Sequence, residues 1–385
     1  MNRIYLDNAA TTALAPKVLE AMLPYLNAHY GNASSIYETG RDARQAVDAA
    51  RRQVAELINA KPGEIFFTSG GTESDNWALK GIALANKNKG NHIITSAIEH
   101  HAVLETAHWL EGQGFELTYL PVGSDGIVDP DQVVRAITDR TILISVMAAN
   151  NEIGTLQPVS AIGAIAKAHQ IPFHTDAVQA AGAVPIDVNA WQADLLSLSG
   201  HKFHGPKGIG VLYIRTGTRV ERLIHGGAQE RGRRAGTEHV AGIVGLGAAA
   251  SLAGERLAAG AGRITALRNR LIDGIMTTIP DVRLNGDRER RLPNNANMSF
   301  KYIEGEALLL HLDLNGIAAS SGSACASGSL EPSHVLLAIG LDAEDAHSSI
   351  RFTLSEATTQ EEIDTVLGVL PGIVNKLRAM SPLVS

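Results

Sequence analysis

A lysine among histidines is the first residue of this chain that could do covalent chemistry. The stretch Ser197–Lys207 reads SLSGHKFHGPK and places Lys202 just after a predicted buried strand. Burial and nearby positive charge lower the pKa of a lysine amine, which can then act as a nucleophile and form a Schiff base with an aldehyde cofactor. The alternative is an ordinary solvated lysine in a turn, because lysine is mostly exposed in proteins.

The chain has one cysteine, Cys325, which lies among small residues in the stretch SGSACASGS (Ser321–Ser329). A structural cysteine usually has bulky apolar neighbours, whereas small neighbours leave the thiol accessible, as a nucleophile must be. Packing as a small core residue is the alternative. A single cysteine excludes an intramolecular disulfide and a multi-cysteine metal site within one chain.

Two polar stretches after predicted strands could hold the charged parts of a cofactor. Thr68–Ser74 reads TSGGTES and lies between a strand and a helix, where backbone N–H groups can bind a phosphate; the alternative is a plain turn. Asp176 lies in the stretch HTDAVQ, at the end of a short apolar strand. A buried aspartate needs a partner such as a protonated ring nitrogen, or it can cap a helix.

Three further residues could contact a ligand. His100 opens a predicted helix and could stack on a flat ring and exchange protons, because imidazole titrates near neutrality. Asn151 also follows a strand. Arg351 is a charged residue in an otherwise apolar strand, where its planar group could grip a carboxylate; the alternative is that it simply faces the surface.

The elements that must position these residues alternate between strand and helix from Glu64 to Arg215. This alternation predicts an α/β fold with a mainly parallel sheet covered on both faces. In such sheets, ligands bind at the carboxyl ends of the strands. Two long helices rich in Ala and Leu follow, and the remainder reads as a smaller α+β unit. We expect an N-terminal segment (1–15) and a large domain (16–260), then a small domain with the cysteine stretch (261–385).

The composition argues against several classes of partner. The chain has 385 residues and a net charge of −7, and its Lys and Arg residues form no run longer than pairs such as Arg51-Arg52 and Arg233-Arg234. We therefore expect neither nucleic acid nor an anionic membrane as a partner. The N-terminus lacks the pattern of a leader, and no apolar run reads as a membrane span, so we expect a cytoplasmic protein.

Eight stretches in order resemble the cysteine desulfurases, enzymes of the class-V aminotransferase family that use pyridoxal 5'-phosphate. The match is to the nitrogen-fixation or iron–sulfur-cluster branch, which has a long cysteine loop. The stretches are YLDNAATT at Tyr5, FTSGGTES at Phe67, EH at Glu99, NNEIG at Asn150, HTDAVQ at His174, SGHKF at Ser199, QERGRRAGTE at Gln229 and SGSAC at Ser321. The resemblance implies fold type I, with a mainly parallel seven-stranded sheet, helices on both faces and a smaller α+β domain.

The resemblance also implies a role for each candidate residue. Lys202 carries the cofactor as a Schiff base, and Cys325 receives the sulfur as a persulfide. By the same resemblance, His100 stacks on the ring and transfers the thiol proton, Asp176 pairs with the ring nitrogen, and Gln179 contacts the phenolic oxygen. The phosphate is bound by Gly71, Thr72, Ser199 and His201, and Thr237 contacts the phosphate of the neighbouring subunit. Asn151 contacts both the cofactor and the substrate carboxylate, and Arg351 binds that carboxylate. The Thr237 role implies a homodimer with shared sites.

The implied reaction converts L-cysteine to L-alanine and passes the sulfur from Cys325 to an acceptor such as an iron–sulfur scaffold protein. Two rivals remain: a selenocysteine lyase or another class-V aminotransferase, and a sulfur carrier without catalysis. The chain departs from the family in the stretch GNASSIY (Gly31–Tyr37), where Ala33 and Tyr37 replace the usual proline and histidine. No role for that histidine is therefore carried over.

Overall fold

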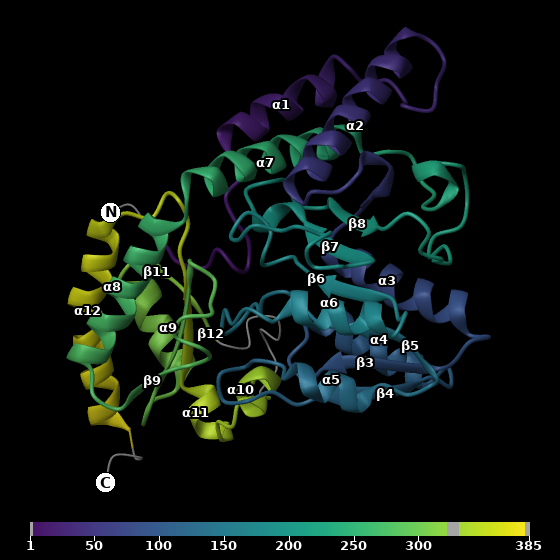
Figure 1. Ribbon diagram of the computed structural model, residues 1–385. Coiled ribbons are helices and arrows are strands. Elements are labelled where there is room, and N and C mark those ends of the chain that lie inside the picture. The colour runs from purple at the N-terminus through teal and green to yellow at the C-terminus, as the bar shows by residue number, and fades with distance from the viewer. Residues whose placement is uncertain (1–2, 322–330, 382–385) are drawn as a thin grey trace.

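The computed structural model describes residues 3–321 and 331–381, and its largest element is a seven-stranded sheet with the order β2-β8-β7-β6-β5-β3-β4 (Figure 1). The strands are β2 (Ile65–Thr68), β3 (His92–Ser96), β4 (Glu116–Leu120), β5 (Thr141–Ser145), β6 (Phe173–Asp176), β7 (Leu195–Ser199) and β8 (Gly210–Ile214). Strands β3 to β7 are parallel, and β8 runs antiparallel to β2 and β7. The predicted α/β class and mainly parallel sheet are confirmed.

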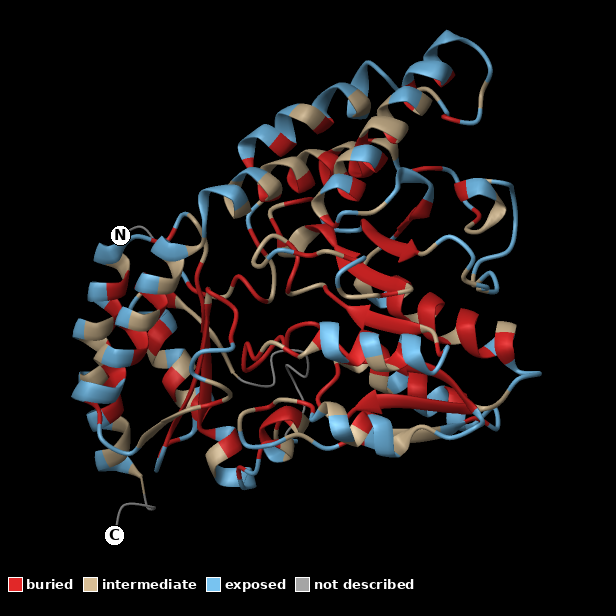
Figure 2. Ribbon diagram, viewed as in Figure 1, coloured by how far each residue is buried: buried red, intermediate tan, exposed pale blue. Residues whose placement is uncertain are grey.

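Both faces of this sheet are buried. Successive side chains of a strand point to opposite faces of the sheet, and here the side chains on both faces are apolar. In β8, Val211 and Tyr213 join the core on one face, whereas Leu212 and Ile214 join the core on the other. Figure 2 shows the strands in the middle of the sheet as a buried layer between helices whose outer faces are exposed. The sheet is therefore a rigid support for the residues that follow its strands.

Helices cover the two faces. Side chains of α3 and α4 fill the core on one face, and those of α1, α2, α5, α6 and α7 fill the core on the other. The helices are α1 (Pro16–Asn27), α2 (Glu38–Leu57), α3 (Gly71–Asn86), α4 (His101–Glu111), α5 (Pro130–Ala136), α6 (Val159–Ala168) and α7 (Val240–Ala259), with short 3-10 turns η1 (Pro62–Glu64), η2 (Gly200–Lys202) and η3 (Glu230–Gly232). The proline at the start of α1 begins the helix, as its fixed φ favours.

The C-terminal part contains a second sheet, antiparallel, with the order β12-β13-β10-β9. Helices α8, α9 and α12 pack beside it, at the left of Figure 1. Its elements are α8 (Gly262–Thr278), β9 (Val282–Leu284), β10 (Asn295–Phe300), α9 (Gly305–Leu314), β11 (Ile317–Ala318), β12 (Ser320–Ser321), α10 (His334–Ala338), α11 (Ala343–His347), β13 (Ser349–Thr353) and α12 (Gln360–Met380). The N-terminal strand β1 (Ile4–Tyr5) pairs with β11, so the start of the chain joins this C-terminal part.

Helix α3 begins at Gly71, inside the stretch Thr68–Ser74, and the Glu73 side chain accepts a hydrogen bond from the Ser69 N–H (2.8 Å) that closes the first turn. One expectation needs correction. Helix α7 has the length and apolar composition of a membrane span, contrary to the expectation that no run does. Half of that helix is buried, and it packs against α1 and α2, as a core helix does.

Candidate active site

The predicted site residues meet at one edge of the seven-stranded sheet. Strands β2, β3, β5, β6 and β7 all end there, and the loops after them surround a cavity of about 260 Å³, here called the active-site cavity. Its lining includes Gly71, Thr72, His100, Asn151, Asp176, Gln179, Ser199, His201, Lys202 and Arg351. These are all of the predicted site residues except Thr237 and Cys325.

Lys202 enters the cavity from the short turn η2, which directly follows β7. Its Nζ atom donates hydrogen bonds to the backbone carbonyl oxygens of Ala9 (2.6 Å) and Ala10 (2.8 Å). Gln179 donates to the same Ala9 carbonyl (3.0 Å). The N-terminal segment is therefore one wall of the cavity, and it holds the lysine amine through neutral acceptors.

One part of the cavity is suited to a phosphate. The N-terminus of α3 presents backbone N–H groups at Gly71 and Thr72, and Ser199 lines the cavity beside them. A Cβ atom on Gly71 would lie 2.8 Å from Cγ2 of Val178, so only glycine fits here without movement of the neighbour. Burial and the neighbouring Lys202 and Lys207 lower the pKa of His201 to about 4, so its neutral ring is available as a hydrogen-bond donor.

Buried carboxyl groups line another part of the cavity. Asp176 is 5% exposed, and its Oδ1 accepts a hydrogen bond from the Val178 N–H (2.9 Å), so it also makes the capping contact considered as the alternative. Asp75, on α3, is 1% exposed, and its Oδ1 lies 3.6 Å from Nε2 of His174. Burial raises the pKa of both carboxyls, and the charge of Asp176 raises the pKa of Asp75 further. A cation brought to these carboxyls would be stabilised.

His100 caps helix α4: its Nδ1 accepts a hydrogen bond from the Ala102 N–H (3.1 Å). Burial, with Lys202 nearby, lowers the pKa of His100 to about 4. Glu99, directly before it, accepts hydrogen bonds from the Ser96 hydroxyl (2.5 Å) and the Met147 N–H (2.9 Å), and burial raises the pKa of Glu99 to about 8. The pKa of about 4 keeps the His100 ring neutral at physiological pH.

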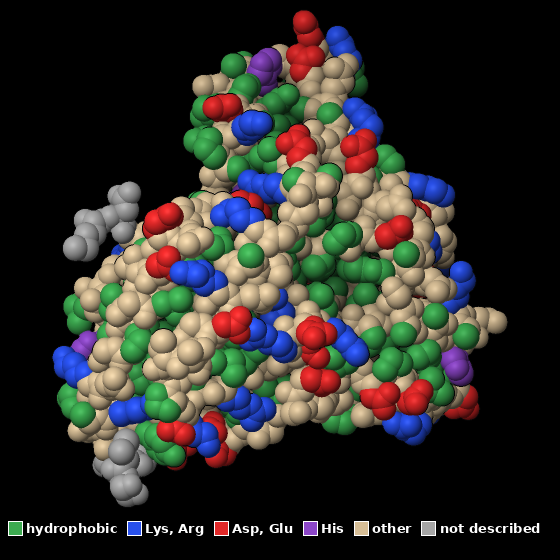
Figure 3. Space-filling view, turned by 60° about the vertical axis from the view of Figure 1, so that its left-hand side comes forward, with side chains coloured by type: hydrophobic (Ala, Val, Ile, Leu, Met, Phe, Trp, Pro, Cys, Tyr) green, Lys and Arg blue, Asp and Glu red, His purple; other side chains and the backbone are tan. Residues whose placement is uncertain are grey.

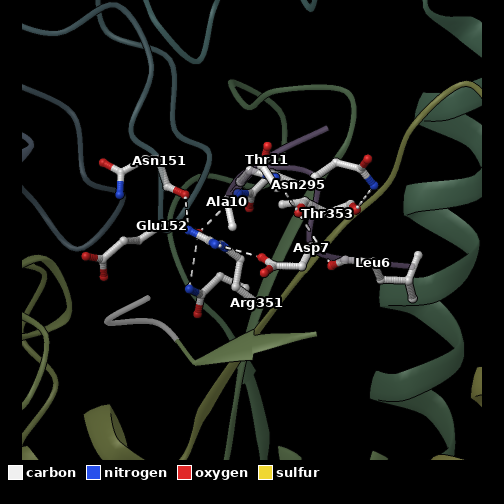
Figure 4. A network of polar contacts seen from close by, with 12 residues as sticks. Leu6, Asp7, Ala10, Thr11, Asn151, Glu152, Asn295, Arg351 and Thr353 are labelled. Carbon is white, nitrogen blue, oxygen red and sulfur yellow. Dashed lines mark hydrogen bonds and ion pairs between the residues drawn. The ribbon is translucent and has the colours of Figure 1, made fainter. Parts of the chain in front are cut away.

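Arg351 reaches the cavity from β13 of the second sheet and is 1% exposed. Its Nη1 donates to the Asn151 carbonyl oxygen (2.9 Å), and its Nη2 donates to Oδ1 of Asp7 (2.9 Å), as Figure 4 shows. Arg351 is therefore not a surface residue. It is a buried cation that joins the two sheets at the cavity.

One predicted site residue lies away from the cavity, and another falls outside the part of the chain that the structure describes. Thr237 is exposed in the loop between η3 and α7 and does not line the cavity. Cys325 lies outside the described residues. The chain on either side of the cysteine stretch is anchored close to the cavity: Ser320 pairs with Arg351, and the Ser333 hydroxyl donates to the carboxyl group of Glu152.

Sequence reasoning missed two acidic residues of this site. Asp75 follows Thr72 by three positions on α3, so the two side chains share a helix face, and that spacing could have identified it. Asp7 lies in the stretch YLDNAATT, but its partner Arg351 is 344 positions away, so no local signal pointed to the contact.

The donor set fits pyridoxal 5'-phosphate. Helix N–H groups, the Ser199 and Thr72 hydroxyls and His201 suit the phosphate, and the buried Asp176 suits a protonated ring nitrogen. The amine of Lys202 lies at the wall of the same cavity and suits an aldehyde.

Comparison with known proteins agrees with this geometry. The family model described as "Aminotransferase class-V" matches residues 4–366. The protein named "Cysteine desulfurase IscS" from Methanosarcina thermophila is 60% identical over 380 residues, which cover 99% of this chain and 94% of that protein. A protein from Nostoc sp. named "Cysteine desulfurase" is 52% identical over 382 residues, covering 99% of this chain and 95% of its own length.

Solved structures show the same similarity. A structure titled "NIFS-LIKE PROTEIN" superposes with a TM-score of 0.92 at 40% identity and covers 97% of this chain and 100% of its own. Another, titled "SspA in complex with cysteine", has a TM-score of 0.81 at 38% identity and covers 91% of this chain and 98% of its own.

Proposed function

We propose a function for a chain that belongs to the class-V aminotransferase family: it is a cysteine desulfurase that uses pyridoxal 5'-phosphate. The observation that carries the proposal is the convergence of Lys202, Asp176 and His100 on one cavity with a buried arginine, Arg351, at its edge. Lys202 provides an amine, Asp176 an anion for a ring nitrogen and His100 an imidazole. Arg351 provides a cation that can bind a carboxylate.

The cofactor is held by residues on several walls of the active-site cavity. The N-terminus of α3 at Gly71 and Thr72, with Ser199 and His201, would hold the phosphate. Asp176 pairs with the ring nitrogen. His100 and Gln179, which also line the cavity, would contact the face of the ring and its phenolic oxygen.

Bound pyridoxal phosphate supplies an aldehyde for amines and a ring system that accepts the electron pair left when a proton leaves the substrate Cα. Lys202 removes that proton, since its amine lies at the wall of the cavity and the carbonyls of Ala9 and Ala10 hold it there. Arg351 and Asn151 orient the substrate carboxylate, because both line the cavity beside the lysine. His100 lines the same cavity and handles the proton of the substrate thiol.

Cys325 takes the sulfur. Its thiolate attacks the sulfur of the substrate, an S–S bond forms, and the substrate Cβ–S bond breaks with its electron pair left on carbon. The carbon skeleton gains protons and leaves as L-alanine, while the sulfur stays as a persulfide on Cys325. Two described residues that flank the cysteine stretch support this role: Ser320 pairs with Arg351, which lines the cavity, and Ser333 donates a hydrogen bond to Glu152, the neighbour of the cavity residue Asn151.

The sulfur acceptor is an iron–sulfur scaffold protein or another sulfur-accepting protein. This part of the proposal follows from the similarity to the nitrogen-fixation and iron–sulfur-cluster branch. The enzyme works in the cytoplasm, without a nucleic acid or membrane partner, in keeping with its net charge of −7.

The enzyme is a homodimer with shared active sites. Thr237 is exposed and does not line its own cavity, so its position allows it to reach the phosphate of a second copy. Leu19, Leu23 and Leu26 are 44%, 47% and 58% exposed on one face of α1. Figure 3 shows hydrophobic side chains on the projecting upper part of the surface, where α1 and α2 lie. A second copy would bury this face.

The division into an N-terminal segment (1–15), a large domain (16–260) and a small domain (261–385) also remains our proposal. The change from the seven-stranded sheet to the second sheet between α7 and α8 supports it.

An assay of alanine and sulfide formation from L-cysteine, with and without a reductant, tests the function. We expect equal amounts of alanine and sulfide with the reductant, and a persulfide on Cys325 without it. The variant Cys325→Ala should keep the cofactor's visible absorbance and lose alanine formation. Undiminished alanine from that variant would point to another class-V activity, and a protein that gains no colour with pyridoxal phosphate would point to a carrier.

A further inference from the structure

We infer that Asp7 is a further substrate-positioning residue: its carboxylate is a built-in counter-ion of Arg351 that weakens the grip of the arginine on carboxylate ligands and so favours product release. The inference rests on the proposed function, in which Arg351 receives the substrate carboxylate. It starts from the direct contact between the two side chains.

The contact is well defined. Nη2 of Arg351 lies 2.9 Å from Oδ1 of Asp7, and Nη1 lies 2.9 Å from the Asn151 carbonyl oxygen (Figure 4). The side chain of Arg351 is 2% exposed and that of Asp7 is 21% exposed. The Nε atom of Arg351 has no hydrogen-bond partner among residues 3–321 and 331–381. The guanidinium therefore keeps donor capacity for a second carboxylate while one is already bound.

Asp7 is held in place by the backbone of β13, the strand that carries Arg351. Asp7 forms a parallel bridge with Thr353, and the residues on either side of it are tied to Thr353 as well. The Thr353 N–H donates to the Leu6 carbonyl (2.7 Å), the Asn8 side chain donates to the Thr353 carbonyl (2.8 Å), and the Ala9 N–H donates to the Thr353 hydroxyl (2.8 Å). The Asp7 carboxylate is therefore preorganised beside the guanidinium.

Glu152, the other acidic residue near Arg351, does not pair with the arginine through its carboxyl group. Glu152 is 3% exposed, its carboxyl group accepts from the Ser333 hydroxyl, and burial raises its pKa to about 7 despite the nearby arginine. Its backbone carbonyl accepts hydrogen bonds from the side chains of Asn295 and Asn297 (3.1 Å each). Asp7 is thus the carboxylate that pairs with the arginine directly.

A carboxylate ligand that binds Arg351 must share the guanidinium with Asp7. Two like charges on one cation repel each other, and the site is buried, so solvent screens this repulsion less than at a surface. Asp7 therefore lowers the affinity for substrate and product carboxylates alike. Uniformly weaker binding of this kind prevents the released L-alanine from occupying the enzyme.

The variant Asp7→Asn tests the inference, because asparagine keeps an Oδ1 acceptor for Arg351 and nearly the same shape while it removes the negative charge. The holoenzyme is titrated with L-alanine and with ethylamine, which has the same amine and lacks the carboxylate, and the visible absorbance of the cofactor reports binding. We expect the dissociation constant for L-alanine to fall about tenfold, in line with a lost like-charge repulsion, and that for ethylamine to stay the same.

A matched control is Asp364→Asn, which removes a surface Asp–Arg pair with Arg270 (2.6 Å) and should change neither affinity. If Asp7→Asn holds no cofactor, Asp7→Ser, which also keeps an oxygen acceptor, is measured in the same way. An unchanged or weaker affinity of either variant for L-alanine overturns the inference and leaves the proposed function intact. A wild-type enzyme that binds L-alanine no better than ethylamine overturns the role of Arg351, and the inference with it.

Discussion

Lys202 and Ala9 are 193 positions apart in the sequence, yet Nζ of Lys202 lies 2.6 Å from the carbonyl oxygen of Ala9. The same segment is tied to the turn that carries the lysine, because the Thr12 N–H donates to the His201 carbonyl (2.9 Å). The N-terminal segment therefore fixes the position of the amine on which the proposed chemistry depends.

Replacing Lys202 by arginine should show whether the site needs only a positive charge at this position or an amine that forms a Schiff base. Lys202→Arg keeps a cation that can donate to the carbonyls of Ala9 and Ala10, but a guanidinium forms no Schiff base with the cofactor. We expect a folded protein without the visible Schiff-base absorbance, and a fall in alanine formation of about 10²- to 10⁴-fold. The control Lys207→Arg, at an exposed position in the same stretch, should keep both. Persistent Schiff-base absorbance in Lys202→Arg would mean that another lysine carries the cofactor.

Gly71 should be needed for tight binding of the cofactor phosphate. In Gly71→Ala the new Cβ would lie 2.8 Å from Cγ2 of Val178, so the first turn of α3 or Val178 must move. We expect the dissociation constant of the cofactor to rise about tenfold, which corresponds to about 1.4 kcal/mol. The double variant Gly71→Ala/Val178→Ala removes the clashing methyl group and should recover most of the affinity.

Gly262→Ala is the matched control for Gly71→Ala. Gly262 is also the first residue of a helix, α8, and no neighbouring group lies within 4 Å of the position that its new Cβ would take. This variant should leave cofactor affinity unchanged. Equal affinities for Gly71→Ala and the wild type would show that the phosphate lies elsewhere.

Glu99→Gln should change how stability depends on pH. The pKa of Glu99 is about 8 in the folded protein, against an ordinary value of 4.5, so the folded protein binds the extra proton between these values. Stability from this group is full below about pH 4.5 and is lost as the pH rises towards 8, by up to about 1.4 kcal/mol per pH unit. Glutamine does not titrate, so as the pH rises the free energy of unfolding should fall less for Glu99→Gln than for the wild type.

Urea titrations of both proteins from about pH 5 to about pH 8 measure this difference. Glu105→Gln, at an exposed position on helix α4, which begins two residues after Glu99, should follow the wild-type curve. A difference between Glu99→Gln and the wild type that stays constant with pH would show that Glu99 is ionised throughout.

The exposed leucines of α1 should hold the proposed dimer together. In the double variant Leu19→Glu/Leu23→Glu, charges replace two apolar side chains on one helix face, and burying them without partners is costly. We expect a monomer in light scattering and weaker cofactor retention, because Thr237 of a second copy is lost. Leu314→Glu, at an 80% exposed position on α9, should remain dimeric. A dimer that survives the α1 variant places the interface elsewhere.

The sequence by itself determined the sheet and the identity of most site residues. Alternating apolar residues in β8 and the strand–helix alternation are local patterns, because backbone geometry repeats every two or 3.6 residues. Polar residues at or just beyond the ends of such strands, such as Asp176 and Lys202, were therefore predictable as members of one site.

Only the tertiary structure decided which distant groups meet. The pairing of Asp7 with Arg351 and the contact of Lys202 with Ala9 join segments that are 344 and 193 positions apart in the sequence. The exposure of Thr237 outside its own cavity was likewise decided by packing. Such contacts depend on how the elements pack in three dimensions, and sequence spacing carries no record of that geometry.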